Sequence, residues 1–173
     1  MNQNPVISVG RGAAFAVAAI AGLGFATPVS AQTANSTLNV TATVTANCTV
    51  STSPVAFGTV NPISGSNIDS TGGVTVTCTN GTGWTAAAGV GSGSGATLLS
   101  RRMTAGGNTL TYNLFTDAAR STIWGDGTGT TVTVGNTGTG SGQSFTVYGR
   151  VGSGQTSVPP GSYADTVSVT VSY

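Results

Sequence analysis

The chain has 173 residues, of which only 5% are charged, against about 25% in an average globular protein. It contains five Arg and four Asp but no Lys, Glu or His, so the commonest general bases and metal ligands are absent. A formal net charge of +1 provides no basic surface for nucleic acid. The composition therefore argues against most enzymes and against nucleic-acid-binding proteins, and we expect no cofactor, metal or small-molecule substrate.

The first 31 residues have the pattern of a secretory signal peptide. Arg11 precedes an apolar stretch, residues 12–26, which is shorter than the roughly 20 residues of a membrane-spanning helix. Pro28 breaks this stretch, and residues 29–31 (Val-Ser-Ala) form a cleavage site of the small-x-small type. We therefore predict export with cleavage after Ala31. A retained N-terminal membrane anchor is the alternative.

Two cysteines, Cys48 and Cys78, remain after this cleavage. An even number of cysteines in an exported chain indicates a disulfide bond. The alternative, a metal or redox site, would normally show a C-x-x-C motif or a His partner, and the sequence has neither. The predicted bond closes a loop of about 30 residues and stabilises the fold by roughly 3.5 kcal/mol.

The rest of the chain has the pattern of β-strands separated by turns. Apolar and polar residues alternate, as they do in half-buried strands, and Gly-, Asn- and Pro-rich turns interrupt the alternation. The expected strands cover residues 38–45, 74–78, 84–88, 110–116, 130–134, 144–150 and 164–173. About seven short strands, frequent turns and one disulfide predict an all-β, immunoglobulin-like β-sandwich.

The most regular alternating strands lie at the two ends of the mature chain. The first places four apolar residues on one face: Leu38, Val40, Ala42 and Val44. The last does the same with Val167, Val169, Val171 and Tyr173. Neither contains Lys, Arg or Pro, which commonly protect an exposed edge from pairing with another chain. Two interpretations stay open: both strands are internal to a closed sandwich, or one of them is donated to a neighbouring chain.

The few charged residues have structural as well as catalytic explanations. Asp117 and Asp126 could act as a pair of glycosidase carboxylates, although Asp-Gly at Asp126 is also a turn signal. Arg101 and Arg102 are too few to bind a polyanion. We expect Asp165 to form at most a structural ion pair with Arg150.

The aromatic residues also allow two interpretations. A cluster of exposed rings could stack on a sugar, whereas rings in a small β-domain usually pack in the core. The residues concerned are Trp84, Trp124, Tyr112 and Tyr148.

Several motifs resemble the spore coat protein U domain, which spore coat protein U shares with the subunits of archaic (Csu-type) chaperone–usher pili. The motifs occur in the family's order across residues 46–173 and end in Gly-x-Tyr-x-Asp-Thr followed by an alternating strand. They comprise residues 47–50, 57–59, 74–78, 110–120, 124–127, 145–150 and 161–173.

The resemblance implies an incomplete immunoglobulin-like fold of the pilin type. Such a fold lacks its last strand, so a hydrophobic groove is left open until a partner donates a strand. A periplasmic chaperone does so first, and at the outer-membrane usher the N-terminal segment of the next subunit replaces the chaperone. The implied organisation is a signal peptide (1–31), a donor-strand segment (32–45) and a body (46–173).

The resemblance also assigns roles to the two terminal strands. The groove is filled by the donor residues Leu38, Val40, Ala42 and Val44. The edge of the groove, where the chaperone binds, is formed by Val167, Val169, Val171 and Tyr173. The final aromatic is the last residue here, whereas in pilins it is the penultimate one.

The function expected from these observations is structural. The chain is expected to pass through the periplasm and to join identical or related subunits head to tail in a cell-surface pilus that serves adhesion and biofilm formation. The alternatives are a spore or cell-surface coat protein with the same domain, and a carbohydrate-binding adhesin.

Overall fold

The computed structural model describes residues 28–173 and divides the chain into two units, Met1–Thr41 and Ala42–Tyr173. Most of the predicted signal peptide therefore lies outside the described residues, and its cleavage stays a prediction. Residues 28–47 form no strand and are exposed. The strand expected over residues 38–45 is thus not formed within a single chain, and its side chains Leu38, Val40 and Val44 are 89%, 84% and 84% exposed.

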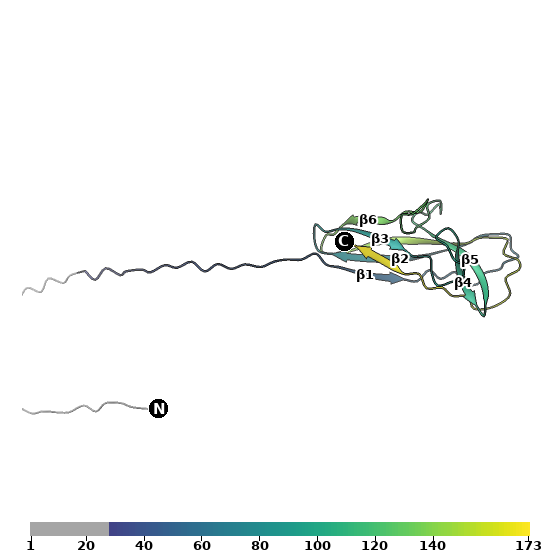
Figure 1. Cartoon of the computed structure of the whole chain (residues 1–173), viewed down its shortest axis with the longest axis horizontal. Coiled ribbons are helices and arrows are strands. Elements are labelled where there is room, and N and C mark those ends of the chain that lie inside the picture. Colours follow the sequence, from purple (N-terminus) through teal and green to yellow (C-terminus); the bar gives the residue numbers. More distant parts are fainter. Residues whose placement is uncertain (1–27) are drawn as a thin grey trace, which may run out of the picture. The chain divides into compact units, whose positions relative to one another are not determined.

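The body consists of antiparallel strands in two sheets (Figure 1). The five-stranded sheet has the order β1-β2-β7-β5-β4, and the three-stranded sheet has the order β6-β3-β8. The strands are β1 (Cys48–Ser53), β2 (Ile68–Cys78), β3 (Gly83–Ala88), β4 (Arg101–Ala105), β5 (Asn108–Phe115), β6 (Val134–Thr137), β7 (Gly142–Val151) and β8 (Val169–Ser172). Over residues 28–173, no helix is long and apolar enough to cross a membrane.

The core lies between the two sheets because the alternating residues of each sheet point toward the other. In the five-stranded sheet, β2 and β7 pair along ten residues, and Val76 and Val151 are 0% and 1% exposed. From the opposite sheet, alternate residues of β3 are buried. Trp124 fills the centre, with its indole Nε1 donating to the Ala86 carbonyl (3.1 Å) and its ring in edge-to-face contact with Phe145.

Five of the observed strands differ clearly from the expected ones, and one of them is β2, which begins at Ile68 and not at Val74. The sequence pattern missed β1 because all but one of its residues are exposed, and it missed β4 because β4 begins with two arginines. Strand β6 starts at Val134, where the strand expected over residues 130–134 was to end. The expected last strand, residues 164–173, is paired as β8 only from Val169, because its partner β3 ends at Ala88 opposite that residue.

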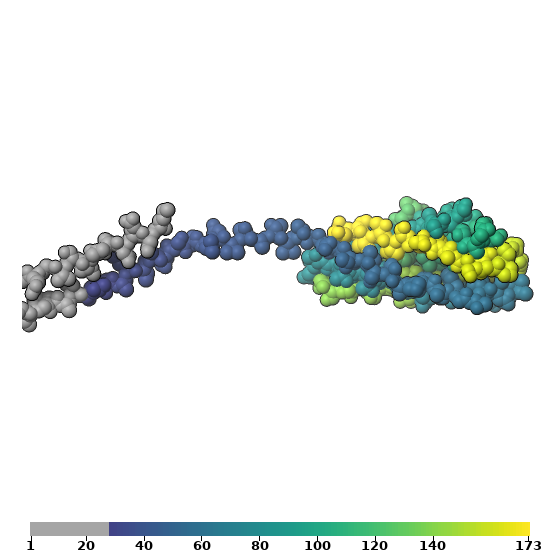
Figure 2. Space-filling view, turned by 90° about the horizontal axis from the view of Figure 1, so that it is seen from below, coloured from purple at the N-terminus to yellow at the C-terminus, as the bar shows by residue number. Residues whose placement is uncertain are grey.

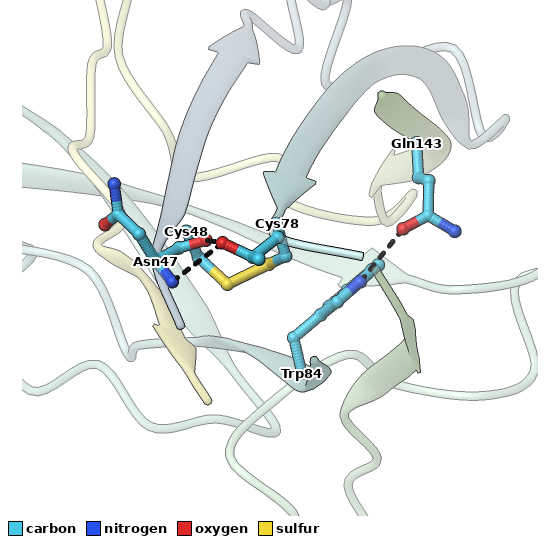
Figure 3. The surroundings of a disulfide bond; sticks show 6 residues. Asn47, Cys48, Cys78, Trp84 and Gln143 are labelled. Carbon is cyan, nitrogen blue, oxygen red and sulfur yellow. Dashed lines mark hydrogen bonds between the residues drawn. A yellow bond between two sulfur atoms is a disulfide. The ribbon is translucent and has the colours of Figure 1, made fainter. Parts of the chain in front are cut away.

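A disulfide bond joins the first residue of β1 to the last residue of β2, as Figure 3 shows. Cys48 and Cys78 are direct neighbours in the register of these strands. Next to them, the Asn47 and Thr79 backbones are joined by a 2.9 Å hydrogen bond, and the Thr79 hydroxyl accepts from the Asn47 N–H. Trp84 closes the same end of the core and donates to Gln143 (3.1 Å). The edge strand β1 is therefore held to the body at its N-terminal end.

Candidate functional site: an open groove between two unpaired walls

A groove of about 940 Å³ runs along the body between two stretches of chain. One wall is formed by residues 52–60, which continue from β1, and the other by residues 158–169, which lead into β8. Figure 2 shows these stretches as neighbouring blue and yellow bands along one face. The apolar floor between them consists of Val74, Leu110, Leu114 and Val147. The groove thus reaches down to the core between the two sheets, although these four floor residues are themselves buried.

The first wall lies close against the five-stranded sheet because the sheet has glycines beneath it. A Cβ atom at Gly72 would lie 2.8 Å from Val55, and one at Gly149 would lie 2.6 Å from the same side chain. Phe57 follows on this wall and makes an edge-to-face contact with Tyr112, with 6.0 Å between ring centroids. Residues 54–60 make no backbone–backbone hydrogen bonds within the described chain. The Ala56 carbonyl accepts from the Ser70 hydroxyl (2.6 Å), and the remaining N–H and C=O groups of this stretch can pair with an added strand.

The second wall is fixed at several points, but it too has an unpaired side. The Tyr163 hydroxyl donates to the Pro159 carbonyl (2.8 Å), and Ala164 and Thr104 exchange two backbone hydrogen bonds (2.9 and 3.2 Å). Strand β8 pairs with β3 and with no other strand of the described residues. Strand β1 likewise pairs only with β2. The walls therefore continue two sheet edges that lack a neighbour.

Among residues 28–173, Asp165 is the only charged residue that lines the groove. Its carboxylate accepts from the Tyr112 hydroxyl (2.7 Å) and from both the backbone N–H and the hydroxyl of Ser92 (2.6 and 2.8 Å). Burial works to raise the pKa of Asp165, but these hydrogen bonds outweigh it, so its pKa lies below the usual value. Burial, together with the bond to Asp165, raises the pKa of the Tyr112 hydroxyl. The pair is therefore a carboxylate and a neutral phenol at neutral pH.

The residues predicted for the last strand lie as follows. Val167 and Val169 line the groove. Val171 is half-buried in β8, and Tyr173 follows that strand and is 59% exposed. The predicted donor residues lie in the stretch without strands, so nothing in a single chain tests their role.

The expected ion pair between Asp165 and Arg150 is wrong. The Arg150 guanidinium instead donates twice to Asp69, at 2.7 and 2.9 Å. Asp69 and Arg150 are direct neighbours in the register of β2 and β7, which brings opposite charges together on one face of the sheet. Arg120 joins this cluster, 3.2 Å from Asp69.

The carboxylates of Asp117 and Asp126 each accept hydrogen bonds from residues a few positions further along the chain. Asp117 accepts from the backbone N–H groups of Ser121 and Thr122, and Asp126 accepts from Thr128. These bonds lower the pKa of both carboxyl groups. A general acid needs a raised pKa, so these carboxylates do not have the electrostatics of a glycosidase pair.

Three of the four aromatic residues considered for sugar stacking are buried. Trp84, Trp124 and Tyr112 are 5%, 1% and 6% exposed, and only Tyr148 is half-buried, beneath the guanidinium of Arg120. The described residues contain no group of three or more Cys or Asp side chains that could hold a metal ion.

Sequence reasoning missed the buried Arg101, which is 0% exposed. Its guanidinium donates five hydrogen bonds, all to neutral oxygens: those of Ala88, Gly89, Leu98, Asn113 and Trp124. Burial lowers the pKa of Arg101. The alternation of Arg101 with the apolar Met103 was the one available signal that Arg101 points inward.

The fold and the groove define a class of protein, an immunoglobulin-like β-sandwich that is open along one side. The structure matches a crystal structure of the CsuC–CsuE chaperone–tip adhesion subunit pre-assembly complex from the archaic chaperone–usher Csu pili of Acinetobacter baumannii. The TM-score is 0.54 at 20% sequence identity, and the match covers 76% of this chain and 40% of the other. The predicted all-β, immunoglobulin-like fold is thereby confirmed.

The model of the Spore Coat Protein U domain matches residues 34–170. The chain belongs to this family, and the resemblance seen in the sequence motifs is confirmed. Comparison with curated proteins found no match.

Proposed function

We propose that this chain is an exported pilus subunit that polymerises by donor-strand exchange, with residues 32–45 of one copy filling the groove of the next. The observation that carries the proposal is the groove itself, an apolar channel flanked by residues 54–60, which have no backbone pairing, and by the unpaired side of the second wall. The matched complex from Csu pili joins a chaperone to a tip adhesion subunit. A periplasmic chaperone and an outer-membrane usher are therefore the assembly partners proposed here.

The chemistry of the donor segment complements that of the groove. Residues 32–45 carry no charge, and their apolar face consists of Leu38, Val40, Ala42 and Val44. Burial of each Leu or Val side chain contributes about 1.5–3 kcal/mol, and pairing of the backbone satisfies hydrogen-bonding groups on both walls. The donor and acceptor surfaces differ, so the contact is head to tail and produces a fibre rather than a closed dimer. Such a fibre on the cell surface is suited to adhesion and biofilm formation.

Deletion of residues 32–45 tests the proposal. The truncated subunit is expected to form a 1:1 complex with its periplasmic chaperone but to add no further subunit, because its own groove is intact and its donor is lost. Co-expression with the chaperone and usher, followed by electron microscopy and sizing of shed material, measures both steps. Normal fibres from the truncated chain would overturn the proposal.

A matched pair of full-length variants separates the donor face from the rest of the segment. Val40→Asp places a charge on the face that enters the groove, and Thr41→Asp places one on the opposite face of the same strand. We expect the first to stop polymerisation and the second to permit it. Equal effects of the two would show that no strand with this face is inserted.

A coat protein that assembles without chaperone or usher is the second candidate, because the family model takes its name from a spore coat protein. Expression without either partner separates the two. Stable, folded monomers that assemble unaided would favour the coat protein.

A further inference from the structure

We propose that Asp165, Tyr112 and Ser92 form a clamp that holds the second wall of the groove, residues 158–169, in the position that accepts a donor strand. The inference rests on the proposed function and names the residues that shape its binding site. Asp165 lies on the wall, Tyr112 in β5 of the five-stranded sheet, and Ser92 in the loop after β3 of the other sheet. One carboxylate thus ties the wall to both sheets.

The clamp acts where the wall has few other constraints. Residues 165–167 lie between the Ala164–Thr104 bridge and the start of β8 and pair with no strand of the described chain. In this interval Asp165 accepts from the Tyr112 hydroxyl with Oδ2 and from Ser92 with Oδ1. The same Oδ1 also accepts from the Thr166 N–H (2.7 Å), so the carboxylate fixes the backbone that follows it. The next inward residue is Val167, which lines the groove.

The glycine at position 91 leaves the space that the Asp165 carboxylate occupies. Gly91 has a positive φ of 90°, which favours glycine, and a Cβ atom there would collide with the Asp165 carboxylate. Because residue 91 has no Cβ atom, the backbone at Ser92 can approach Asp165 and donate to it. A side chain at position 91 would push the wall outward.

The clamp also links the two walls. Tyr112 donates to Asp165 on one side, and its ring meets Phe57 of the opposite wall edge-to-face. Through these two contacts, Tyr112 connects Asp165 on the second wall with Phe57 on the first wall. Tyr112→Phe removes the hydrogen bond to Asp165 but keeps the contact of the ring with Phe57. This variant therefore separates positioning of the second wall from packing.

The test uses the full chain with its own donor face disabled by Leu38→Asp and Val40→Asp, refolded with a fluorescent peptide of residues 32–45. The measured quantity is the rate at which the labelled peptide is released into an excess of unlabelled peptide. We expect Asp165→Asn and Tyr112→Phe each to accelerate release at least about fivefold, because a hydrogen bond to a charged acceptor is lost. The double variant should be little faster than either single one, because both remove the same contact.

Asp69→Asn is the matched control, since it breaks a carboxylate–arginine cluster on β2 that does not line the groove. It should lower the melting temperature without changing the release rate. If the clamp variants release peptide at the rate of the unaltered body, or if Asp69→Asn accelerates release equally, the clamp is refuted while the proposed function stands. If the unaltered body captures no peptide, the proposed function itself fails.

Discussion

At the scale of single residues, the most unusual feature is a cation in the core. Arg101 is buried and its direct hydrogen-bond partners are all neutral, so carbonyl and amide dipoles surround its charge while Asp165 and Asp126 act on it only from a distance. Arg101→Met keeps much of the side-chain volume but leaves these acceptors without a donor. We expect it to lower the free energy of unfolding by about 3 kcal/mol or more, because each buried group left unpaired costs about 1–3 kcal/mol.

Arg102→Met is the control for this change. Arg102 is half-exposed and donates one long hydrogen bond, 3.3 Å to Ser94, while its Nε is buried without a partner. Its removal should cost less than about 1 kcal/mol. Urea unfolding followed by tryptophan fluorescence measures both variants, and equal losses would contradict the role assigned to Arg101.

At the scale of elements, the disulfide anchors the start of the strand that leads into the first wall. Strand β1 is an exposed edge strand, and its continuation forms that wall. Replacement of Cys48 and Cys78 by Ser should lower the free energy of unfolding by about 3.5 kcal/mol for a sequence separation of 30 residues. It should also weaken capture of the donor peptide, because β1 can then separate from β2. Unchanged capture would show that the wall does not depend on this bond.

The second wall allows a test with two adjacent residues. Val167 lines the groove, whereas Ser168 is exposed on the other side of the chain. Val167→Asp should abolish capture of a donor strand, because a charge cannot be buried in the apolar groove without a partner. Ser168→Asp should leave capture within about twofold of the unaltered protein. Fluorescence anisotropy with the labelled peptide measures both, and the same loss for each would argue against insertion at this wall.

At the scale of the whole molecule, the composition predicts an unusual dependence of stability on pH. The chain has no His or Glu, and the pKa values of Asp69, Asp117, Asp126 and Asp165 are all lowered in the fold. A lowered pKa adds stability above the unfolded pKa of Asp, about 3.9, and this stability is lost as the pH falls through the folded value. We expect a constant melting temperature from about pH 5 to 8 and a fall below about pH 4. A transition near pH 6.5 would contradict this account.

The sequence predicted the all-β class, the cysteine pair and most central strands because these features follow from alternation and local turns. It could not predict Arg101 or Asp165 correctly, because their partners come from distant strands and loops that only the folded topology brings together. Edge strand β1 was missed for a related reason, since an exposed strand has no buried face to produce a pattern. The donor role proposed for residues 38–45 belongs to an assembly, so a single chain does not test it.

Hydrogen exchange on assembled fibres tests the central claim most directly. In the separate chain, residues 38–45 form no strand and their backbone is exposed, so their amides should exchange rapidly. In the fibre, the account predicts strong protection of these amides together with those of residues 55–60 and 167–168, because all three stretches become paired. Fibres in which residues 38–45 still exchange as fast as in a free peptide would contradict donor-strand polymerisation.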